Sequence, residues 1–278
     1  MSAPILCGTD FSANATQAAD AAAALAMKLG VKLILAHSLD ERGEIPDYLR
    51  PQLRYSLEPR LVSEAARVRA LGAEVEEHLI RGVPDDGLLA LAANCGARFI
   101  VLAASGTGAL GRWMLGSVAE QTAESAPLPT LVIRAAQPLV AWARESRPLR
   151  ILAGVDFTAN SEAALRWIAG IRDIGPCEIT LGFIDDGQDE TPDAALRERA
   201  QSIVGTEPAI ILERAASARI DAHLLKIADD IRADLIVVGT HQWRGVQRLR
   251  HASVSRRLLR DAPVSVVCVP ESGAWQGG

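Results

Sequence analysis

The sequence predicts two consecutive α/β domains, each built on a parallel sheet with helices on both faces. Short apolar runs alternate with longer amphipathic stretches along the whole chain, which is typical of strands joined by crossover helices. The apolar runs RFIVLA and DLIVVG are nearly continuous, as expected for central strands buried on both faces. The whole pattern also occurs twice, which indicates an internal duplication.

Two aligned blocks carry the duplication. ILCGTDFSAN near the start of the chain matches ILAGVDFTAN further on and places Asp10 opposite Asp156, an offset of 156 − 10 = 146 residues. A second block from Leu88 matches one from Leu224, an offset of 224 − 88 = 136 residues. The second copy is therefore shorter between the two blocks. We place the difference after the second strand, where both copies are polar and contain proline, as expected for a surface connection.

In the first copy, apolar runs predict five strands, at Pro4–Gly8, Lys32–His37, Glu74–Ile80, Arg98–Ala103 and Thr130–Arg134. Amphipathic stretches predict helices at Ala13–Leu29, Leu57–Leu71, Asp85–Cys95 and Ser117–Ser125. Gly30, Gly72 and Gly96 directly follow helical runs, where a left-handed C-cap is favoured. Asp85 is expected to cap the third helix.

In the second copy, the expected strands are Arg150–Gly154, Glu178–Ile184, Ala209–Glu213, Asp234–Gly239 and Ser265–Pro270. The expected helices are Ser161–Arg172, Pro192–Val204, Ile220–Ile231 and Ser253–Arg260. The stretch Ala135–Arg150 between the copies carries two prolines and several charges. It predicts domains at 1–137 and 148–272 joined by a linker at 138–147, with Trp142 packed on a domain surface.

Composition excludes several classes of protein. A length of 278 residues fits two domains, and 49% hydrophobic with 23% charged residues is typical of globular chains. A formal net charge of −5 argues against a general nucleic-acid binder. The sequence shows neither a basic, apolar leader after the first Met nor a membrane-length apolar run, so we expect a cytoplasmic protein without a membrane partner. The four cysteines lack C-x-x-C spacing and are expected to be small buried side chains.

A set of motifs recurs across both copies. The first copy contains Asp10 after a strand, Gly82-Val83-Pro84, and the runs ARFIV, GSVAE and APLPTLVI. The second contains Asp156, ADLIVVGTH, ASVS and APVSVVCV. Together these motifs resemble the universal stress protein family over nearly the whole chain. The resemblance implies two Rossmann-like (adenine nucleotide alpha hydrolase-like) domains, each with a five-stranded parallel sheet.

The resemblance also implies a function and an assembly. It implies a stress-response regulatory protein that binds an adenine nucleotide, ATP with or without Mg²⁺. It further implies a dimer formed largely through the last strand, which the two halves of one chain could form internally, with a homodimer also open. Both last strands are apolar, and an apolar sheet edge is a pairing hazard if left uncovered.

A nucleotide site is expected where the carboxyl ends of the strands meet the switch in strand order. Asp10 would accept hydrogen bonds from a ribose, while Gly116 and Ser117 open a helix whose amides suit phosphate. The nucleotide-binding branch of the family shows G-x-x-G, nine residues, then G-[ST]. The first copy keeps this spacing, but Ala103 replaces the first glycine. The resemblance implies binding through Thr9, Asp10, Ala36, Leu102, Ala103, Ser105, Gly106, Gly116, Ser117 and Val118.

The second copy departs further from the same pattern. Gln242 and Ala252 replace the second and third glycines, so we expect a weaker site formed by Asp156, Gly239, His241 and Ser253. The same region carries Arg244, Arg248, Arg250, His251, Arg256 and Arg257. This cluster fits an anion-binding loop that uses side chains, a solvated face, or a degenerate domain that supports the first copy.

Three classes of function stay open. The first is a nucleotide-binding regulator without turnover, the second an ATPase or related transferase, and the third a structural or interaction protein that binds no nucleotide. The sequence lacks a Lys-bearing P-loop and an activated nucleophile in a known order, which disfavours an enzyme beyond slow ATP hydrolysis. Asp10 and Asp156 also have a structural alternative as helix caps, beside Ser12 and Thr158. No catalytic or metal-ligating residue is expected.

Overall fold

The computed structural model describes residues 3–39, 50–105, 115–145, 147–185, 190–206, 210–216, 219–240 and 254–273. The chain divides into two compact units. The first comprises residues 1–122 and 131–140, and the second comprises 123–130 and 141–278.

The first unit holds the strands β1 (Ile5–Gly8), β2 (Leu33–Leu39), β3 (Val75–Arg81), β4 (Phe99–Ala103) and, apart from its first residue, β5 (Thr130–Ile133). Their order is β3-β2-β1-β4-β5. β1 pairs in parallel with β2 and with β4, and β2 pairs in parallel with β3. The strand order therefore switches direction at β1, which is where ligands bind in doubly wound sheets.

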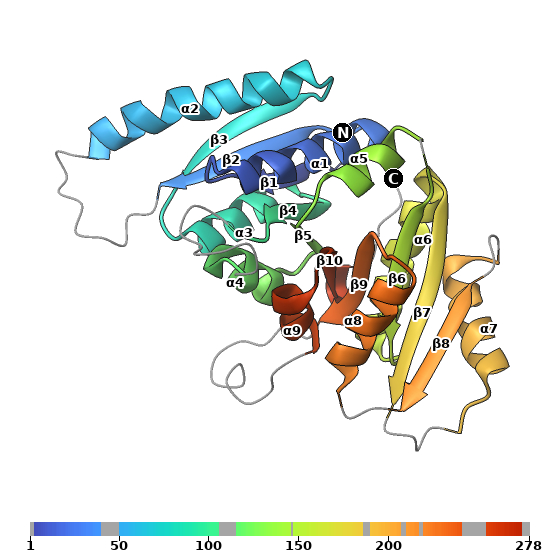
Figure 1. Cartoon of the computed structure of the whole chain (residues 1–278). Helices are drawn as coiled ribbons and strands as arrows, with labels where there is room; N and C mark the ends of the chain where they lie inside the picture. Colours follow the sequence, from blue (N-terminus) through green and yellow to red (C-terminus); the bar gives the residue numbers. More distant parts are fainter. Residues whose placement is uncertain are drawn as a thin grey trace. The chain divides into compact units, whose positions relative to one another are not determined.

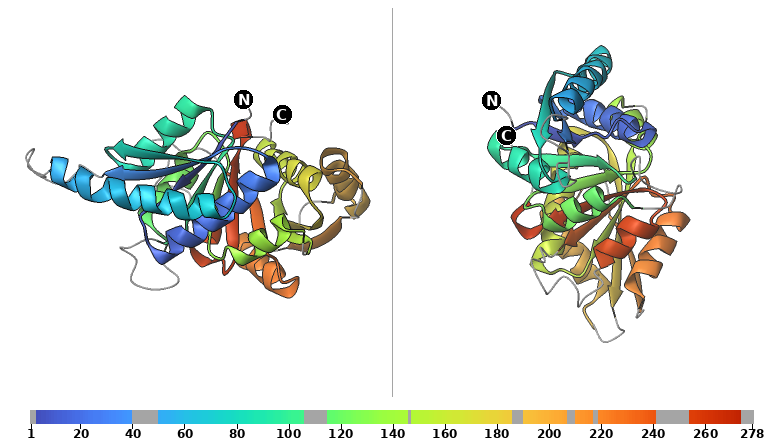
Figure 2. Two further views of the ribbon diagram at one scale, coloured as in Figure 1. Left: turned by 90° about the horizontal axis from the view of Figure 1, so that it is seen from above. Right: turned by 90° about the vertical axis from the view of Figure 1, so that its left-hand side faces the viewer.

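Four helices connect these strands, α1 (Ala13–Leu29), α2 (Arg50–Ala70), α3 (Pro84–Cys95) and α4 (Ser117–Ser125). Right-handed crossovers place α1 and α2 on one face of the sheet and α3 and α4 on the other, as Figures 1 and 2 show. Most buried residues of α1 are alanines, and small side chains let a helix lie close to the strands. Ser12 caps α1, because its Oγ accepts a hydrogen bond from the Ala15 amide at 3.1 Å.

The second unit repeats this architecture. Its strands are β6 (Leu149–Val155), β7 (Cys177–Asp185), β8 (Ile211–Ala216), β9 (Leu235–Thr240) and β10 (Ser265–Pro270), in the order β10-β9-β6-β7-β8. The β6–β7, β6–β9, β7–β8 and β9–β10 pairs are all parallel. Its helices are α6 (Ala159–Ile174), α7 (Asp193–Val204), α8 (Ile220–Asp230) and α9 (Val254–Asp261). The predicted fold class, two tandem Rossmann-like α/β domains, is confirmed.

Two features at helix ends differ from the sequence prediction. α2 begins at Arg50 and not at the predicted Leu57. The sequence pattern did not indicate its first turns, because they bury few side chains and carry little apolar periodicity. Asp85 does not cap α3, since the helix begins at Pro84 with Val83 as its N-cap. A proline at the first helical position lacks the amide that would need a cap. Gly96 does end α3 in the predicted left-handed conformation, with φ 61°.

Trp142 does not lie on a domain surface. The predicted linker contains the helix α5 (Gln137–Ala143), and Trp142 near its end is fully buried. The indole Nε1 donates a hydrogen bond to the carbonyl of Pro176 at 2.9 Å. The ring also lies against Gly175, where an added Cβ would be 2.8 Å from Cε2 and Cζ2 of the indole. The end of the linker is therefore part of the core of the second unit.

The cysteines behave as small apolar side chains. Cys7, Cys177 and Cys268 are buried, and Cys95 is partly exposed; all four are free thiols. Burial raises the pKa of Cys7, Cys177 and Cys268 to about 12 in each case, so these thiols are unreactive at neutral pH. Among the described helices, none combines the length and apolar character needed to cross a bilayer.

The contact between Trp142 and Gly175 gives a first prediction. Gly175 has extended backbone dihedrals, with φ −177°, so replacing it with alanine costs packing and not backbone strain. Gly175→Ala should lower the free energy of unfolding by about 1–3 kcal/mol, the usual range for overpacking. Chemical denaturation measures this change. In a Trp142→Leu background the cost of Gly175→Ala should largely vanish, and an unchanged cost would contradict the proposed clash.

Candidate functional site

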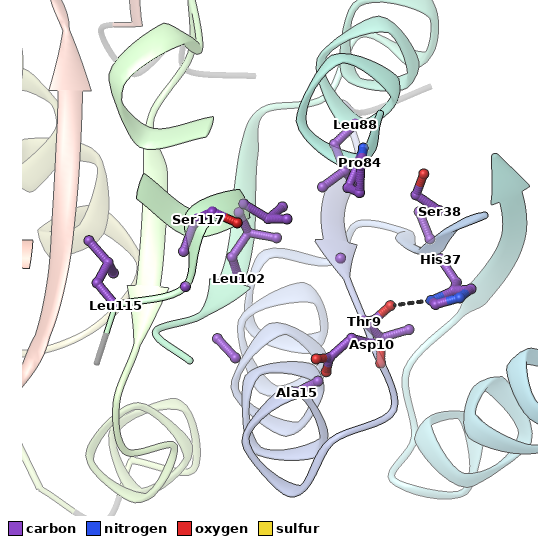
Figure 3. Close-up of a pocket in the computed structure, with 16 residues that line it drawn as sticks. Thr9, Asp10, Ala15, His37, Ser38, Pro84, Leu88, Leu102, Leu115 and Ser117 are labelled. Carbon is purple, nitrogen blue, oxygen red and sulfur yellow. Dashed lines mark hydrogen bonds between the residues drawn. The ribbon is translucent and has the colours of Figure 1, made fainter. Parts of the chain in front are cut away.

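A pocket of about 480 Å³ opens in the first unit, at the carboxyl ends of β1, β2 and β4. Figure 3 shows its walls, which also include the first turns of α3 and α4. Eight of the ten residues predicted for the first site line it, namely Thr9, Asp10, Ala36, Leu102, Ala103, Gly116, Ser117 and Val118. The structure therefore brings together segments that lie far apart in the sequence.

Of the other two residues predicted for the first site, Ser105 is described and does not line this pocket, whereas Gly106 is not tested. Ser105 is buried, and its Oγ accepts a hydrogen bond from Nδ2 of Asn14 at 2.8 Å. Ser105 thus ties the end of β4 to the start of α1. Gly106 and the residues that follow it through 114 lie outside the described residues.

Asp10 lies in a tight turn between β1 and α1. Its Oδ1 accepts a hydrogen bond from the Ser12 amide at 3.0 Å, while Ser12 itself caps the helix. The residue that caps α1 is therefore Ser12 and not Asp10. Asp10 instead stabilises the turn and contributes a carboxylate to the pocket wall.

Phe11 gives this turn its shape. Its φ is 63°, in the left-handed region that residues with a side chain rarely adopt. The Phe11 amide donates a hydrogen bond to Oγ1 of Thr9 at 3.1 Å. Phe157 occupies the same position in the second unit and also has a positive φ, 52°. Such local strain, repeated at equivalent positions, is typical of functional turns.

His37 is a pocket residue that the sequence analysis missed. Its Nδ1 lies 2.7 Å from the carbonyl oxygen of Thr9, drawn as a dashed line in Figure 3. Because a carbonyl only accepts, Nδ1 carries the hydrogen. Burial lowers the pKa of His37 despite the opposing effects of the Thr9 hydrogen bond and the Asp10 charge. The imidazole is therefore neutral at pH 7, and Nε2 is a hydrogen-bond acceptor.

The end of the pocket near α4 is suited to an anion. The Gly116 amide donates a hydrogen bond to the carbonyl of Ala104 at 2.7 Å, which fixes the start of α4 beside the end of β4. Ser117 then begins a helix of nine residues, whose first turn carries free amides and a partial positive charge. Phosphate groups bind at such helix ends.

The opposite wall is apolar and closely packed. A Cβ at Gly8 would lie 2.6 Å from Cδ2 of Leu102 and 3.2 Å from Cδ1 of Leu88. Leu88 and Pro84 of α3 line the pocket beside Leu102. The sequence analysis missed these two residues because nothing in the spacing of α3 shows which of its sides faces the end of β1. An apolar wall opposite a polar one suits a ligand with a flat apolar group and charged substituents.

The equivalent pocket in the second unit is half as large, about 240 Å³. Asp156 and Gly239, two of the four residues predicted for this site, line it. His241 and Ser253, the other two, lie outside the described residues, as do Gln242 and Ala252. A Cβ at Gly239 would lie 2.5 Å from the backbone carbon of Asn160. This glycine is therefore required for the close approach of α6 to β9.

Asp156 is held by hydrogen bonds from its own turn. Its Oδ1 accepts from the Thr158 amide at 3.0 Å and from the Thr158 hydroxyl at 2.7 Å. Burial alone would raise the pKa of Asp156, but hydrogen bonds from Thr158 and Ser161 outweigh it and hold the pKa below its usual value. Thr158 is the N-cap of α6 by position, yet its side chain makes no capping bond.

Of the predicted arginine cluster in the second unit, only Arg256 and Arg257 lie in the described part of the chain. Both take part in ion pairs. Arg257 Nη1 contacts Oδ1 of the buried Asp221 at 3.2 Å. These two arginines therefore stabilise the unit. Within the described ranges, no three His, Cys, Asp or Glu side chains are grouped to hold a metal ion.

The environment of His37 predicts a pH dependence of stability. The folded pKa of His37 lies below its ordinary value of 6.5, so the unfolded chain takes up the proton first as the pH falls. The stability that this neutral histidine contributes is therefore lost from about pH 6.5 downward, towards the lower folded pKa. Wild type should lose more free energy of unfolding than His37→Phe between about pH 7.5 and pH 5.5. Urea titrations at both pH values measure this, and parallel losses would contradict the assignment.

Comparisons with known proteins agree with this architecture. The model of the universal stress protein family matches residues 1–134 and 149–270. A universal stress protein of Thermus aquaticus is 34% identical over 137 residues, which is 47% of this chain and 97% of that protein. The crystal structure of a universal stress protein from Archaeoglobus fulgidus covers 96% of this chain and 98% of its own, with a TM-score of 0.78 and 20% identity.

A second structure from Archaeoglobus fulgidus, a universal stress protein in complex with dAMP, is 28% identical over 47% of this chain and 97% of its own, with a TM-score of 0.38. The family model covers both repeats of the present sequence almost completely, in agreement with the duplicated strand order. The chain belongs to the universal stress protein family, in a tandem form with two domains.

Proposed function

We propose that this protein is a stress-response regulator that binds one adenine nucleotide, ATP, in its first unit, with the second as a degenerate partner. One observation carries the proposal. The pocket of the first unit, about 480 Å³, combines an apolar wall, a carboxylate and the N-terminus of a helix. Ligand pockets usually measure about 300–1,000 Å³, so this one has the size for a nucleotide.

The chemistry of the walls suggests how the nucleotide lies. The adenine would pack among Ala36, Leu88 and Leu102, and the ribose hydroxyls would donate to the carboxylate of Asp10. The phosphates would accept from the free amides in the first turn of α4 and from the Ser117 hydroxyl, with Mg²⁺ as their counter-ion in solution. Ala103 lines the pocket, so the methyl group that replaces the family's first glycine would contact the ligand there.

The second unit is proposed to bind nucleotide weakly or not at all. Its pocket, about 240 Å³, is smaller than the usual range for ligands. Gly239, which matches the family's first glycine, already accommodates the backbone of α6. The site of Asp156, Gly239, His241 and Ser253 is therefore proposed as the minor one.

The proposal includes no turnover reaction beyond slow ATP hydrolysis. The alternatives are a weak ATPase and a structural or interaction protein that binds no nucleotide. We also propose that the two sequence repeats span 1–137 and 148–272, with Trp142 of the segment between them packed into the second unit. A cytoplasmic location and a protein that contacts neither membrane nor nucleic acid are part of the proposal. Pairing of the two last strands and a homodimer stay predictions.

Matched substitutions in the two units test the asymmetry. Asp10→Asn should weaken ATP binding by about tenfold or more, since a hydrogen bond to a charged group contributes about 1.5–3 kcal/mol. Asp156→Asn should leave the affinity unchanged. Isothermal titration calorimetry should give one site per chain for wild type.

A second pair concerns the phosphate end. Gly116→Arg places a long side chain at the start of α4 and should abolish measurable ATP binding, whereas Ala252→Arg at the matching position should change it little. Mass spectrometry of small molecules released from the denatured protein would identify a ligand retained in purification. Two equal sites would refute the asymmetry. No binding at millimolar ATP would favour the structural protein, and phosphate release by wild type that Gly116→Arg abolishes would favour the ATPase.

A further inference from the structure

The strained turn after the first strand of each unit has an arginine over its aromatic ring. The guanidinium carbon of Arg60, on α2, lies 4.5 Å from the centroid of the Phe11 ring. The guanidinium carbon of Arg199, on α7, lies 4.9 Å from the centroid of the Phe157 ring. At such distances a cation is attracted to the face of an aromatic ring.

The contact between an arginine and a phenylalanine ring recurs in both units, although the arginines come from the segment in which the two copies differ most. Asp10 and Asp156 align at an offset of 146 residues, the later blocks at 136, and Arg60 and Arg199 are 199 − 60 = 139 residues apart. The connecting segments differ in length and sequence, yet in each unit an arginine lies over the equivalent phenylalanine ring. A surface arginine placed without constraint would not be expected over both rings.

Each phenylalanine also contacts a ring on the neighbouring strand. The centroid of Phe11 lies 4.4 Å from that of His37, and the centroid of Phe157 lies 6.0 Å from that of Phe183. His37 and Phe183 occupy equivalent positions. Gly8 pairs with the residue before His37, and Gly154 pairs with the residue before Phe183. Arg60, Phe11 and His37 thus form a stack that runs from α2 to the pocket of the first unit.

The stack is connected to the polar groups of the pocket by short hydrogen bonds. The Phe11 amide donates to Thr9, and the next amide, that of Ser12, donates to Oδ1 of Asp10. The second of these bonds depends on the left-handed conformation of Phe11, because the backbone dihedral angles of Phe11 set where the Ser12 amide lies. Anything that holds the Phe11 ring therefore also holds the carboxylate of Asp10 in its present direction.

The two arginines are anchored differently. Arg199 donates to the carbonyl of Phe157 at 3.0 Å and pairs with Glu162 at 2.7 Å. Among the described residues, Arg60 has no ion-pair partner, and its contact there is with the Phe11 ring. In the first unit, the contribution of the arginine to holding the turn thus comes from the cation–π contact.

We propose that Arg60 is a positioning residue for the pocket of the first unit, acting through the Phe11 ring to hold the turn that carries Asp10. The residue does not need to touch the ligand. The effect on a nucleotide rests on the proposed function, but the effect on the turn exists without any ligand and is tested separately.

The turn itself is tested by amide hydrogen exchange on the protein without ligand, followed by NMR. Arg60→Met should speed exchange of the Phe11 and Ser12 amides by about two- to fivefold, the size expected for an exposed cation–π contact. Exchange in the core strand β1, at Leu6, should not change, whereas a general loss of stability would speed it too. Arg60→Lys keeps a cation over the ring and should restore most of the protection. Arg54→Met, on the same helix, is the control.

The action on the ligand is tested by a double-mutant cycle with ATP as the probe. Arg60→Met should weaken ATP binding by about two- to fivefold. Phe11→Gly removes the ring but adopts a positive φ freely, so this variant keeps the fold. In the Phe11→Gly background, Arg60→Met should have no further effect, and Arg199→Met should leave ATP binding unchanged.

The outcomes separate the two proposals. Undiminished weakening by Arg60→Met in the Phe11→Gly background would mean that Arg60 acts on the ligand by its charge or by direct contact and not through the Phe11 ring, which overturns the positioning role. Unchanged exchange at Phe11 and Ser12 in Arg60→Met would overturn it as well. Faster exchange at these two amides in a protein that binds no ATP would uphold the role of Arg60 in the turn and refute the proposed function alone.

Discussion

The direction of the crossovers around β1 is the constraint on which the site depends. The chain leaves β1 towards β2 and returns from β3 to β4 on the other side of β1. Because both connections are right-handed, α1 and α3 lie on opposite faces of the sheet. The end of β1 is then covered by neither helix, and a crevice opens there in both units. The residues that differ between the copies decide how deep it is.

The two pockets differ at the position where the fourth strand of each unit meets the helix that follows the first strand. In the second unit the backbone of α6 approaches β9 so closely that only a glycine fits at position 239. In the first unit Ala103 occupies the equivalent position and lines an open pocket. The copy that keeps this glycine thus has the smaller cavity. A glycine in the nucleotide-binding motif indicates that another group approaches the backbone closely. At Gly239 that group is the backbone of α6.

Much of this fold could be predicted from the sequence, because the repeat, the apolar periodicity and the glycines at helix ends are local signals. Asp10 and Gly116 could be predicted as pocket residues because parallel strands end at one edge of the sheet. His37 and Leu88 could not, since their side chains reach the pocket only through the packing of neighbouring elements. The burial of Trp142 was missed for the same reason, since it depends on contacts remote in sequence. The start of α2 was missed because its first turns are polar and carry little apolar periodicity.

Trp142 has a consequence for how such a duplicated chain can be divided. The repeat begins again only at Ile151. The indole of Trp142, nine residues upstream, nevertheless packs in the interior beside Gly175 and Pro176. A second half excised at the repeat boundary would carry a hole the size of a tryptophan side chain, and interior holes of that size are among the costliest defects a small domain can have. The unit of duplication and the unit of independent folding therefore do not coincide in this chain.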